Sequence, residues 1–541
     1  MFPWLGFSEK LPLPKFVLLS DARLPSPEVR LVRGPATSGT PKSSAERIGG
    51  LDPLKSIPVR VADFLLEVYI SRVMPSYPIF HEPWLVSCHA AVIHRVLSND
   101  GGTNRPSSYE IFITSLVMAI SLSTAARSKQ ARANDMAFKL FQHAITRLGE
   151  ILTNDFAGLQ ALVLLHTYAV MNPAAANVYF LSGYMMQACI DQELHKEDTR
   201  PMETDLLAQD LKRRVFWSAW ELDVSCSGGF ARPVALLPKH ITTGFPSDLE
   251  DSAIHPGYIN QQARRSKFVC GQVRSFRLIE VEVISVLFHG HPINPAMSSL
   301  EAWMGDVEDR IHSWRADVDH SASANREPSL KVQWEEMVVF AEIALPQVLV
   351  TLFRPCPRIK NPTMPNLLKA FKATVQVVQG YLKQAGMGFG SLKFTFQPCH
   401  HVFSSAMVFL HIIRECPSAL VSMYTLEEMK GFMSAFSDFF SLTTERWPAS
   451  SAYMDEYNRL LEPLKEHYFS SVHLTNTSFQ YQSDELGEYL SGYNLWSLSG
   501  EPGGFSNLVF EPFTDAATAN LWQDGGFDSI DWDRYFDLGA C

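Results

Sequence analysis

Cysteine and histidine most often hold metal ions or act as nucleophiles, and their spacing limits the chemistry open to this chain. The 541 residues include eight cysteines, and the closest two, Cys399 and Cys416, are 17 residues apart. A structural zinc site usually takes its ligands in close-spaced pairs, because a short loop readily presents two of the four. The spacing therefore predicts that the chain carries no zinc cluster, and we expect no cofactor.

Two short patterns resemble metal or catalytic motifs and have simpler interpretations. His81 and Glu82 begin like the HExxH of a zinc protease, but Pro83 is expected to break that helix, and Leu85 stands where the second histidine belongs. The run 399–401 is Cys-His-His, yet adjacent side chains on a helix diverge by about 100°. We interpret these as core or surface histidines and predict no metal or catalytic site.

Two further groups are interpreted as structural. Lys212, Arg213 and Arg214 form the tightest basic cluster of the central region. Because they lie on a predicted helix, we expect a solvated helix face rather than a phosphate-binding site. Gly228 and Gly229 follow the same helix and are expected to form a C-cap with positive φ.

Composition sets the broad class of the protein. Apolar residues make up 46% of the chain and charged residues 19%, which predicts a folded core. The net charge of −11 argues against binding nucleic acid over the whole surface. The longest apolar stretch, Met337 to Phe353, contains Glu342 and Pro346 and is expected to be too short to cross a membrane.

Three regions follow one another along the chain. Residues 1–60 are rich in Pro, Ser and Gly and are expected to form a flexible, disordered arm. Residues 61–469 repeat apolar positions three and four apart, which predicts an all-α, multi-helix domain. The helices expected there include 61–74, 107–126, 133–152, 156–170, 205–224, 333–353, 367–385 and 400–414. Residues 470–541 lose this periodicity and are expected to be a disordered tail.

The tail combines acidic and aromatic residues. From residue 501 onward it holds eight acids against one base, with eight aromatic side chains among them. Acids keep such aromatic groups solvated until an apolar groove of a partner buries them. This pattern predicts an activation segment with Phe527, Trp532, Tyr535 and Phe536 as its anchors, while a tail packed back on the domain is the alternative.

Three stretches together resemble one family. Phe64 to Leu85 is similar to the opening of the regulatory domain of fungal transcription factors of the zinc binuclear cluster (Zn2Cys6) class. Leu211 to Asp248 resembles the most recognisable element of that domain, a basic helix bearing Phe-Trp followed by Gly-x-x-Arg-Pro. Leu349 to Pro362 resembles its later Arg-Pro-x-Pro turn.

The resemblance implies a large helical regulatory domain over about residues 60 to 465. Its motif positions here are Asp223, Arg232, Pro233, Arg354 and Pro355. We interpret both arginines as structural, because a helix C-terminus favours a cation and a fork of donors can fix a turn. Arg232 is expected to satisfy carbonyl groups or to pair with an acid such as Asp223, and Arg354 to act similarly at its own helix end.

One departure from the family concerns DNA binding. Members usually carry an N-terminal six-cysteine zinc cluster that reads DNA, whereas the first cysteine here is Cys88, inside the helical region. The first 60 residues carry nine basic residues against five acids, a small excess. DNA binding by this chain alone is therefore not supported. Either the DNA-binding zinc cluster has been lost, or it is encoded upstream of this sequence.

These observations lead to one main hypothesis and two alternatives, one of which is a partner-dependent co-regulator with no DNA contact of its own. The chain is predicted to be a fungal transcriptional regulator in the nucleus rather than an enzyme, and the resemblance suggests control of metabolic or secondary-metabolite gene clusters. Its expected partners are transcriptional coactivators, with a DNA-binding partner or a homodimer as further candidates, and no membrane. The other alternative is a helical enzyme or small-molecule receptor with a pocket in the helical core.

Overall fold

The computed structural model describes residues 53–98, 106–125, 130–198, 204–228, 231–387, 394–445, 447–473 and Leu490. Within these ranges the chain forms sixteen α-helices, and extended pairing is limited to two isolated bridges. The predicted all-α fold is confirmed. Most of the predicted N-terminal arm and nearly all of the acidic-aromatic tail lie outside the described residues.

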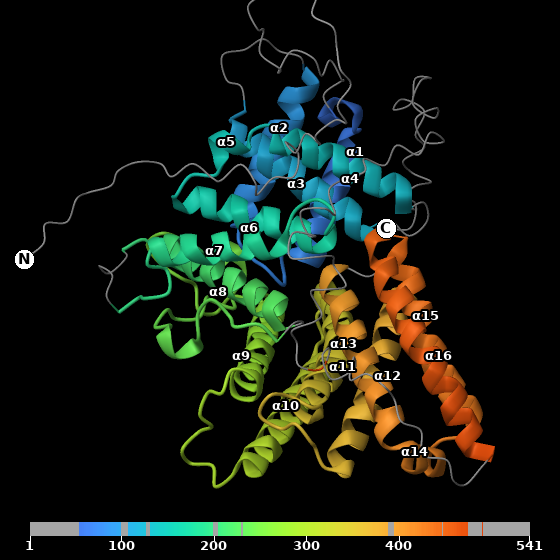
Figure 1. Cartoon of the computed structure of the whole chain (residues 1–541). Coiled ribbons are helices and arrows are strands. Elements are labelled where there is room, and N and C mark those ends of the chain that lie inside the picture. The colour runs from blue at the N-terminus through green and yellow to red at the C-terminus, as the bar shows by residue number, and fades with distance from the viewer. Residues whose placement is uncertain are drawn as a thin grey trace, which may run out of the picture.

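The helices from the first half of the domain gather at one end of the molecule. Figure 1 shows α1 to α6 there, with α7 and α8 leading toward the other end. These helices are α1 (Val59–Val68), α2 (Glu82–Ser98), α3 (Ser108–Ala125), α4 (Gln130–Ile145), α5 (Leu148–Ile151), α6 (Phe156–Met171), α7 (Val178–Asp191) and α8 (Leu206–Gly228). A π-helical turn, Tyr69–Val73, follows α1 directly.

The second half builds the other end from long helices. Successive helices pack on one another there: α10 on α11, α11 on α12 and α12 on α13, with α16 against both α13 and α15. These helices are α9 (Phe268–Phe288), α10 (Leu300–Ala324), α11 (Lys331–Phe353), α12 (Met364–Ala385), α13 (Phe396–Glu415), α14 (Pro417–Met423), α15 (Leu426–Thr444) and α16 (Ser451–His473).

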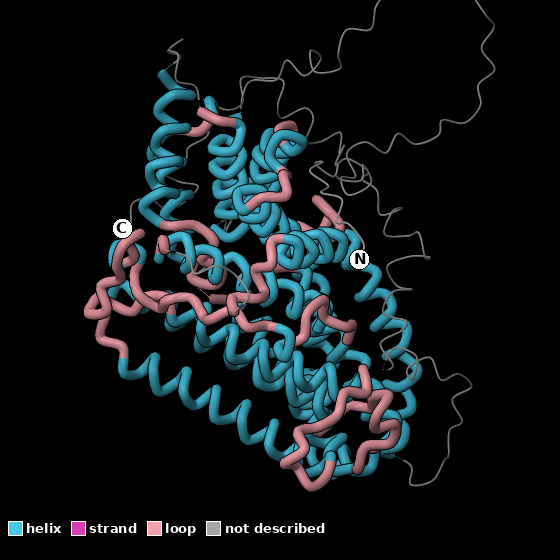
Figure 2. The backbone as a smooth tube through the Cα atoms, turned by 90° about the vertical axis from the view of Figure 1, so that its left-hand side faces the viewer, coloured by secondary structure: helices cyan, strands magenta, loops and turns pink. Residues whose placement is uncertain are grey.

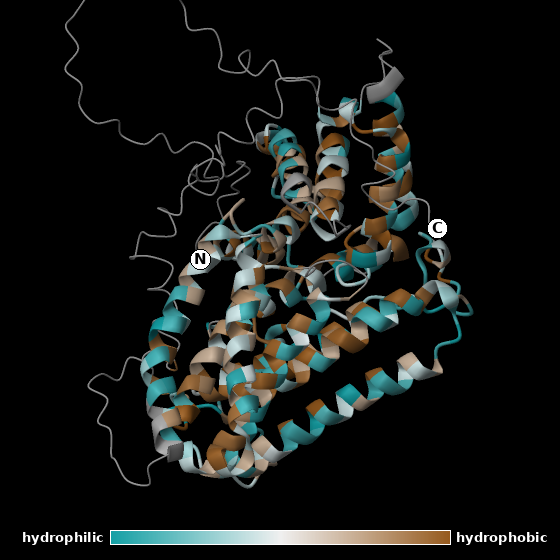
Figure 3. Ribbon diagram, turned by 90° about the vertical axis from the view of Figure 1, so that its right-hand side faces the viewer, coloured by the Kyte–Doolittle hydropathy of each residue, from teal (hydrophilic) through white to brown (hydrophobic). Residues whose placement is uncertain are grey.

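The hydrophobic pattern explains which helices are central. In α6 almost every side chain from Gly158 onward is buried, as expected of a helix that is apolar on all sides. Its start is fixed by Asp155, whose Oδ1 accepts the backbone N–H of Gly158 at 2.8 Å. Figure 2 shows the helices joined by loops, and Figure 3 shows hydrophobic residues on the inward faces of the long helices.

Two predicted helix boundaries were wrong. The single helix expected over 133–152 is two, because α4 ends at Ile145 and α5 begins at Leu148. Between them Arg147 caps a carbonyl group of the preceding turn, with its Nη1 donating to the oxygen of His143 at 2.7 Å. Pro83 was expected to break a helix, but α2 begins at Glu82. Proline is tolerated there because the first-turn N–H groups have no partner within the helix.

The apolar stretch in α11 is longer than the sequence suggested. With the turn before it, Pro328–Phe353 is long and apolar enough to span a membrane by length and composition. However, 56% of that window is buried inside the domain, where α11 packs against α9, α10, α12 and α13. This burial is typical of a core helix.

Candidate functional site

The segment after α8 runs back along that helix. Four hydrogen bonds attach it, from the end of α8 to its start: Ala235 N–H to Asp223 Oδ2 (2.9 Å), Trp220 Nε1–H to the Leu236 carbonyl (2.8 Å), Trp217 Nε1–H to the Gly244 carbonyl (2.9 Å) and Ser247 N–H to Asp210 Oδ1 (2.7 Å). The second family-like motif, Leu211 to Asp248, is therefore a helix with its return segment held against it. As a result, α9 starts beside the start of α8.

A buried cluster of four charged residues lies where α9 starts. The guanidinium of Arg214 contacts Asp210 Oδ2 at 2.5 Å and Asp251 Oδ1 at 2.8 Å. Lys267 Nζ contacts Asp251 Oδ1 at 2.7 Å. The side chain of Arg214 is 0% exposed and that of Lys267 is 9% exposed. Two cations and two carboxylates thus balance, as a buried ionic cluster requires.

The same cluster connects two of the three family-like motifs. The backbone N–H of Glu82, in the first motif, donates to Asp251 Oδ2 at 2.7 Å. The ring Nε2 of His81 lies 3.1 Å from the carbonyl oxygen of Asp251. Because Arg214 belongs to the second motif and also contacts Asp251, this one aspartate attaches the start of α2 to α8.

The surroundings of Asp251 determine its ionisation. Burial by itself raises the pKa of its carboxyl group, but the positive charges of Arg214 and Lys267 outweigh burial and hold that pKa below its ordinary value. The predicted solvated face at Lys212 to Arg214 is therefore wrong for Arg214. A cation on a helix can be fully buried when carboxylates from other segments reach it.

A second set of charges continues along the interface of α8 and α9. Arg274 Nε lies 3.0 Å from Glu221 Oε1, and Arg277 Nη1 lies 2.5 Å from Glu280 Oε2. Arg277 Nη2 also donates to the hydroxyl of Ser225 at 3.0 Å. Burial raises the pKa of Glu221 to about 7 against the opposing effect of Arg274 and Arg277. The contacts advance in the same direction on both helices, so α8 and α9 run parallel.

The end of α8 differs from the predicted glycine cap. Gly228 is still helical, and a Cβ there would lie 2.9 Å from Glu280 Oε1, so close packing on α9 explains the glycine. The positive φ, 50°, is at Ala231, whereas Gly229 lies outside the described residues. The Asp223 carboxylate accepts the hydroxyl of Ser182 at 2.7 Å, besides its bond to the return segment. Burial raises the pKa of Asp223.

The remaining motif residues follow the ends of α8 and α11. The Arg232 guanidinium lies over the ring of Tyr179, 4.1 Å from its centroid, and Pro233 next to it is exposed. Arg354 is buried with Pro355, and its Nη1 donates to the hydroxyl of Ser404 at 2.8 Å. The third motif also contacts the C-terminal end of α9. There Arg358 Nη1 donates to the carbonyl oxygens of Val286 and His291 at 3.1 and 2.7 Å. The structural role proposed for both arginines stays a prediction.

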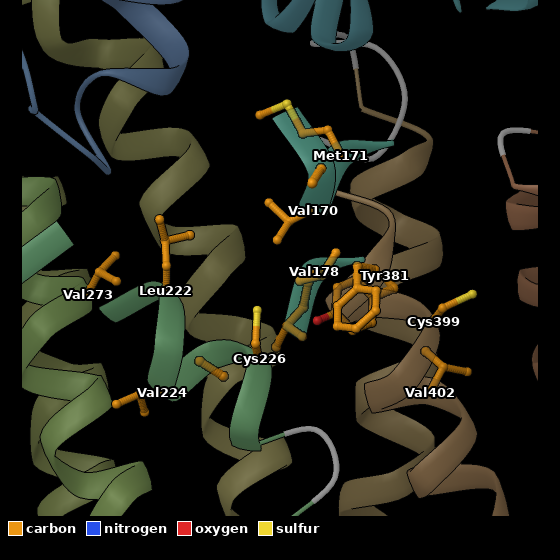
Figure 4. Close-up of a cluster of buried hydrophobic side chains, with 14 of the residues drawn as sticks. Val170, Met171, Val178, Leu222, Val224, Cys226, Val273, Tyr381, Cys399 and Val402 are labelled. Atoms are coloured by element: carbon orange, nitrogen blue, oxygen red, sulfur yellow. The ribbon is translucent and has the colours of Figure 1, made fainter. Parts of the chain in front are cut away.

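A cavity of about 130 Å³ lies where the two ends of the domain meet. Its walls come from the π-helical turn 69–73, the C-terminal part of α8, and helices α9, α11, α12 and α13. Most of the lining is apolar, including the aromatic rings of Tyr77, Phe276, Phe340 and Phe394. Figure 4 shows Cys226 on α8, Val273 on α9 and Tyr381 on α12 within the core of this region.

Part of the cavity lining is polar, and one group of these polar side chains comes from three helices. Arg277 reaches it from α9, Tyr381 from α12, and Gln397 and His401 from α13. The hydroxyl of Tyr381 lies 2.7 Å from Nδ1 of His401. Burial, with the nearby positive charge of Arg277, lowers the pKa of His401 to about 3, so its ring is neutral at physiological pH. We call Arg277, Tyr381, Gln397 and His401 the polar corner.

Polar atoms without a hydrogen-bond partner occur in this corner, as they do elsewhere in the core. Arg277 Nε, Gln397 Oε1 and His401 Nε2 are buried without a hydrogen-bond partner, although their side chains line the cavity. A second, larger hollow of about 330 Å³ lies among α10, α11 and α12. The two cations that line it, Arg315 and Lys383, are both paired with Glu342. The polar corner is therefore the better candidate for a binding site.

Other predicted features are outside this site or remain predictions. Within the described ranges, no group of three or more His, Cys, Asp or Glu side chains is placed to hold a metal ion. His400 and His401 are both buried, as one of the two interpretations expected. The predicted anchors Phe527, Trp532, Tyr535 and Phe536 lie outside the described residues.

The chain is similar to fungal regulatory proteins. It is 21% identical to the "Positive regulator of purine utilization" of Emericella nidulans over 509 aligned residues, covering 76% of this chain and 47% of that protein. It is 22% identical to the "Pyrimidine pathway regulatory protein 1" of Saccharomyces cerevisiae over 284 residues, covering 49% of this chain and 30% of that protein. The chain thus spans less than half the length of either relative.

A family match covers the region of the buried clusters. Residues 66–316 match the fungal specific transcription factor domain. This range contains α8, its return segment, α9 and nearly all of the first two motifs. This match confirms the resemblance that the first two motifs indicated.

Proposed function

We propose that this chain is a fungal transcriptional regulator of metabolic genes that acts in the nucleus and is not an enzyme. The observation that carries the proposal is the family match over residues 66–316. The relatives add support, because the names of the two relatives described above are those of regulators of purine utilization and of a pyrimidine pathway.

The cavity chemistry supports a binding role over catalysis. An active site usually gathers ionisable groups that are free to exchange protons or attack a substrate. In the cavity Arg277 is paired with Glu280 at 2.5 Å, and Arg72 is paired with Glu336 at 2.8 Å. His401 is neutral, because burial lowers its pKa to about 3. We therefore favour a regulator that senses a small molecule over the helical enzyme.

The proposal includes a role for the tail. We infer that residues 470–541 activate transcription through a coactivator and that the helical domain controls this activity. Trp532 and Phe536 are four residues apart and would share one face of a helix formed on binding, with Phe527 and Tyr535 beside them.

The test uses a reporter gene. The full chain is fused to an unrelated DNA-binding module and compared with a fusion that ends at residue 469 and with the module carrying residues 470–541. We expect output from the full chain and the tail, and loss without the tail. Because burying one large aromatic contributes about 1.5–3 kcal/mol, Trp532→Ala with Phe536→Ala should reduce output at least about tenfold.

A matched pair of substitutions controls for charge. Asp531→Asn with Asp533→Asn should reduce output less than the double-alanine change, because exposed charges are screened. Output equal to that of the bare module in all three fusions would refute the proposed activator. Full output from the double-alanine chain would refute the proposed anchors alone.

A further inference from the structure

We propose that the exposed face of helix α2 binds the proline-rich part of the chain's own N-terminal arm, residues 10–27. Such a contact within the chain goes beyond the proposed function and does not depend on it. Three features of the chain point to it: an uncharged helix face with an aromatic platform, a motif that occurs twice in the arm, and the place where the arm joins the domain.

Helix α2 packs against α1 and α3 on one side and is exposed on the other. Trp84 is 39% exposed there, and Val86 is 43% exposed. None of the exposed side chains from residue 83 to residue 94 is an acid, a lysine or an arginine, whereas the outer side of a surface helix usually carries charge. An exposed surface of this kind is typical of an interaction site. We call it the α2 face, and its members are Pro83, Trp84, Val86, Ser87, Ala90 and His94.

Trp84 forms a fixed aromatic platform at the N-terminal end of the α2 face. Its ring stacks on the ring of Phe80, with 5.6 Å between the centroids and 25° between the planes. It also lies 6.1 Å from the ring of Tyr109 on α3. Because Phe80 is only 1% exposed, the platform rests on the buried core. A side chain that is already held in place loses little freedom on binding, and aromatic surfaces of this kind bind proline-rich segments.

The arm carries one short motif twice. Residues 10–14 are Lys-Leu-Pro-Leu-Pro and residues 23–27 are Arg-Leu-Pro-Ser-Pro, so each copy is a cation followed by Leu-Pro-x-Pro. Proline fixes φ at about −65° and favours the extended polyproline II conformation. Aromatic-lined surfaces recognise this conformation. The two motifs are therefore the part of the arm that best suits the α2 face.

The spacing within the motif matches the spacing along the helix. Residues three apart in polyproline II share a face, so Leu24 and Pro27 project to the same side about 9 Å apart. Pro83 and Ala90 are seven residues apart, which places them on one side of α2 about 10 Å apart along its axis. The leucine and the second proline of one motif can thus lie over two turns of α2.

The arm joins the domain beside α2. Its end leads into the short 3-10 helix Pro53–Ser56, which packs on α2 and α4. About 25 residues separate Pro27 from this helix, and a flexible chain of that length has an end-to-end distance of about 25–30 Å. The 17 residues of α2 extend over about 25 Å. The motif can therefore reach the whole α2 face at an effective concentration of about millimolar.

Charge favours the arm over the acidic tail as the occupant. Asp63 and Glu110 lie on α1 and α3, the helices that pack against α2. Asp63 lies 3.5 Å from His89, but burial lowers the pKa of that histidine, so it does not neutralise the carboxylate. The two arginines of these three helices, Arg60 and Arg95, are each engaged in contacts of their own. Each motif begins with a cation, whereas the tail from residue 501 carries eight acids against one base and would be repelled.

The first experiment measures how fast trypsin cleaves the arm of the purified full chain. Trypsin cuts after Lys10 and Arg23, the first residue of each motif. Because only the released arm fits the protease, the cleavage rate follows the released fraction. Trp84→Ala removes the platform and should raise the rate at both positions about fivefold or more.

A second substitution tests the α2 face without altering the platform. Ala90 is exposed, so Ala90→Lys leaves the core intact but covers the face with a cation that repels the motif. It should raise the cleavage rate to a similar extent. The matched control is Ala316→Lys, which adds the same side chain at an exposed position of α10 and should leave the rate unchanged. Circular dichroism verifies that all three variants fold.

The second experiment measures binding of the motif as a separate peptide, by the fluorescence anisotropy of labelled residues 20–30. The peptide should bind a full chain whose own motifs are disrupted, and it should bind the unaltered chain at least about tenfold more weakly, because there the arm occupies the face. A scrambled peptide and the disrupted chain with Trp84→Ala are the controls, and both should abolish binding. The disrupted chain carries Leu11→Ser, Pro12→Ser, Pro14→Ser, Leu24→Ser, Pro25→Ser and Pro27→Ser.

Several outcomes would overturn the inference. These are an unchanged cleavage rate in folded Trp84→Ala or Ala90→Lys, an equal increase in Ala316→Lys, or no binding of the peptide to the disrupted chain. Protection from trypsin that disappears on dilution would assign the α2 face to the arm of a second copy. Equal binding of a peptide of residues 524–538 would show that the face does not select the arm.

Discussion

The buried cation Arg214 can be tested against an exposed partner of the same type in the same part of the molecule. Arg214 contacts Asp210 and Asp251 at 2.5 and 2.8 Å with 0% of its side chain exposed. Arg265 contacts Asp248 at 2.6 Å with 76% of its side chain exposed. Both are Arg–Asp pairs with similar distances, so burial is the main difference between them.

The expected effects of removing each arginine differ several-fold. Arg214→Met leaves two buried carboxylates with only Lys267 nearby, and breaking a buried pair in this way costs about 3–5 kcal/mol. A loss of about 4 kcal/mol reduces the folding equilibrium constant roughly a thousandfold. Arg265→Met removes a solvent-exposed pair, which typically contributes about 0–1 kcal/mol. Arg214→Lys should fall between them, because lysine lacks the fork that reaches two carboxylates.

The assay is urea unfolding of the full chain, followed by circular dichroism at neutral pH. With slopes of about 1–3 kcal/mol per molar urea, Arg214→Met should move the midpoint by more than about 1 M and Arg265→Met by far less. Salt provides a second measurement, because added NaCl should reduce the small effect of Arg265→Met and leave that of Arg214→Met nearly unchanged. Equal midpoint shifts in the two methionine variants would refute the reasoning.

Two more predictions concern stability. Burial lowers the pKa of His166 to about 4, so its folded form resists protonation, and stability is lost as pH falls below the ordinary histidine value of 6.5. His166→Gln should therefore gain about 1.4 kcal/mol of stability relative to the unaltered chain when the pH falls from 7.5 to 5.5 in urea unfolding. A stability difference that stays constant over this pH range would contradict the prediction. Gly228→Ala should destabilise the chain by about 1–3 kcal/mol, because the added Cβ would lie 2.9 Å from Glu280 Oε1. Gly305→Ala has open space around the added Cβ and should stabilise the chain by up to about 1 kcal/mol. Changes of the same sign in the two melting temperatures would contradict the packing argument.

Helical periodicity predicted the fold well because most of the helices have an apolar face or are apolar on all sides. The expected helix 156–170 matches α6 to within one residue, and 333–353 matches α11 although Pro346 lies inside it. The misses occurred where one local interaction decides the boundary. Arg147 caps the end of α4, and Pro83 lies in the first turn of α2. The residue type alone therefore did not show where these two helices end and begin.

The candidate site was much harder to predict from sequence. Charged residues on a helix are usually exposed, so Arg214 was interpreted as surface; its partners Asp251 and Lys267 belong to a later segment of the chain, which only the fold brings near. Arg277 precedes Glu280 by three residues, a spacing that also suits an exposed helix pair. Gln397 carried no signal at all in the sequence.

The ionic contacts between α8 and α9 connect the buried cluster of Asp210, Arg214, Asp251 and Lys267 with the polar corner of the cavity. Arg214, Glu221 and Ser225 lie four or seven residues apart on one face of α8, and they face Lys267, Arg274 and Arg277 in order along α9. An apolar interface would tolerate sliding of one helix past the other, whereas each of these contacts requires a defined partner. Because Arg277 belongs both to this interface and to the polar corner, a ligand that changes its contacts would act on the relative position of α8 and α9. The start of α2 is attached to the other end of the same series through Asp251, so a local change in the cavity has a continuous physical route to the first family motif.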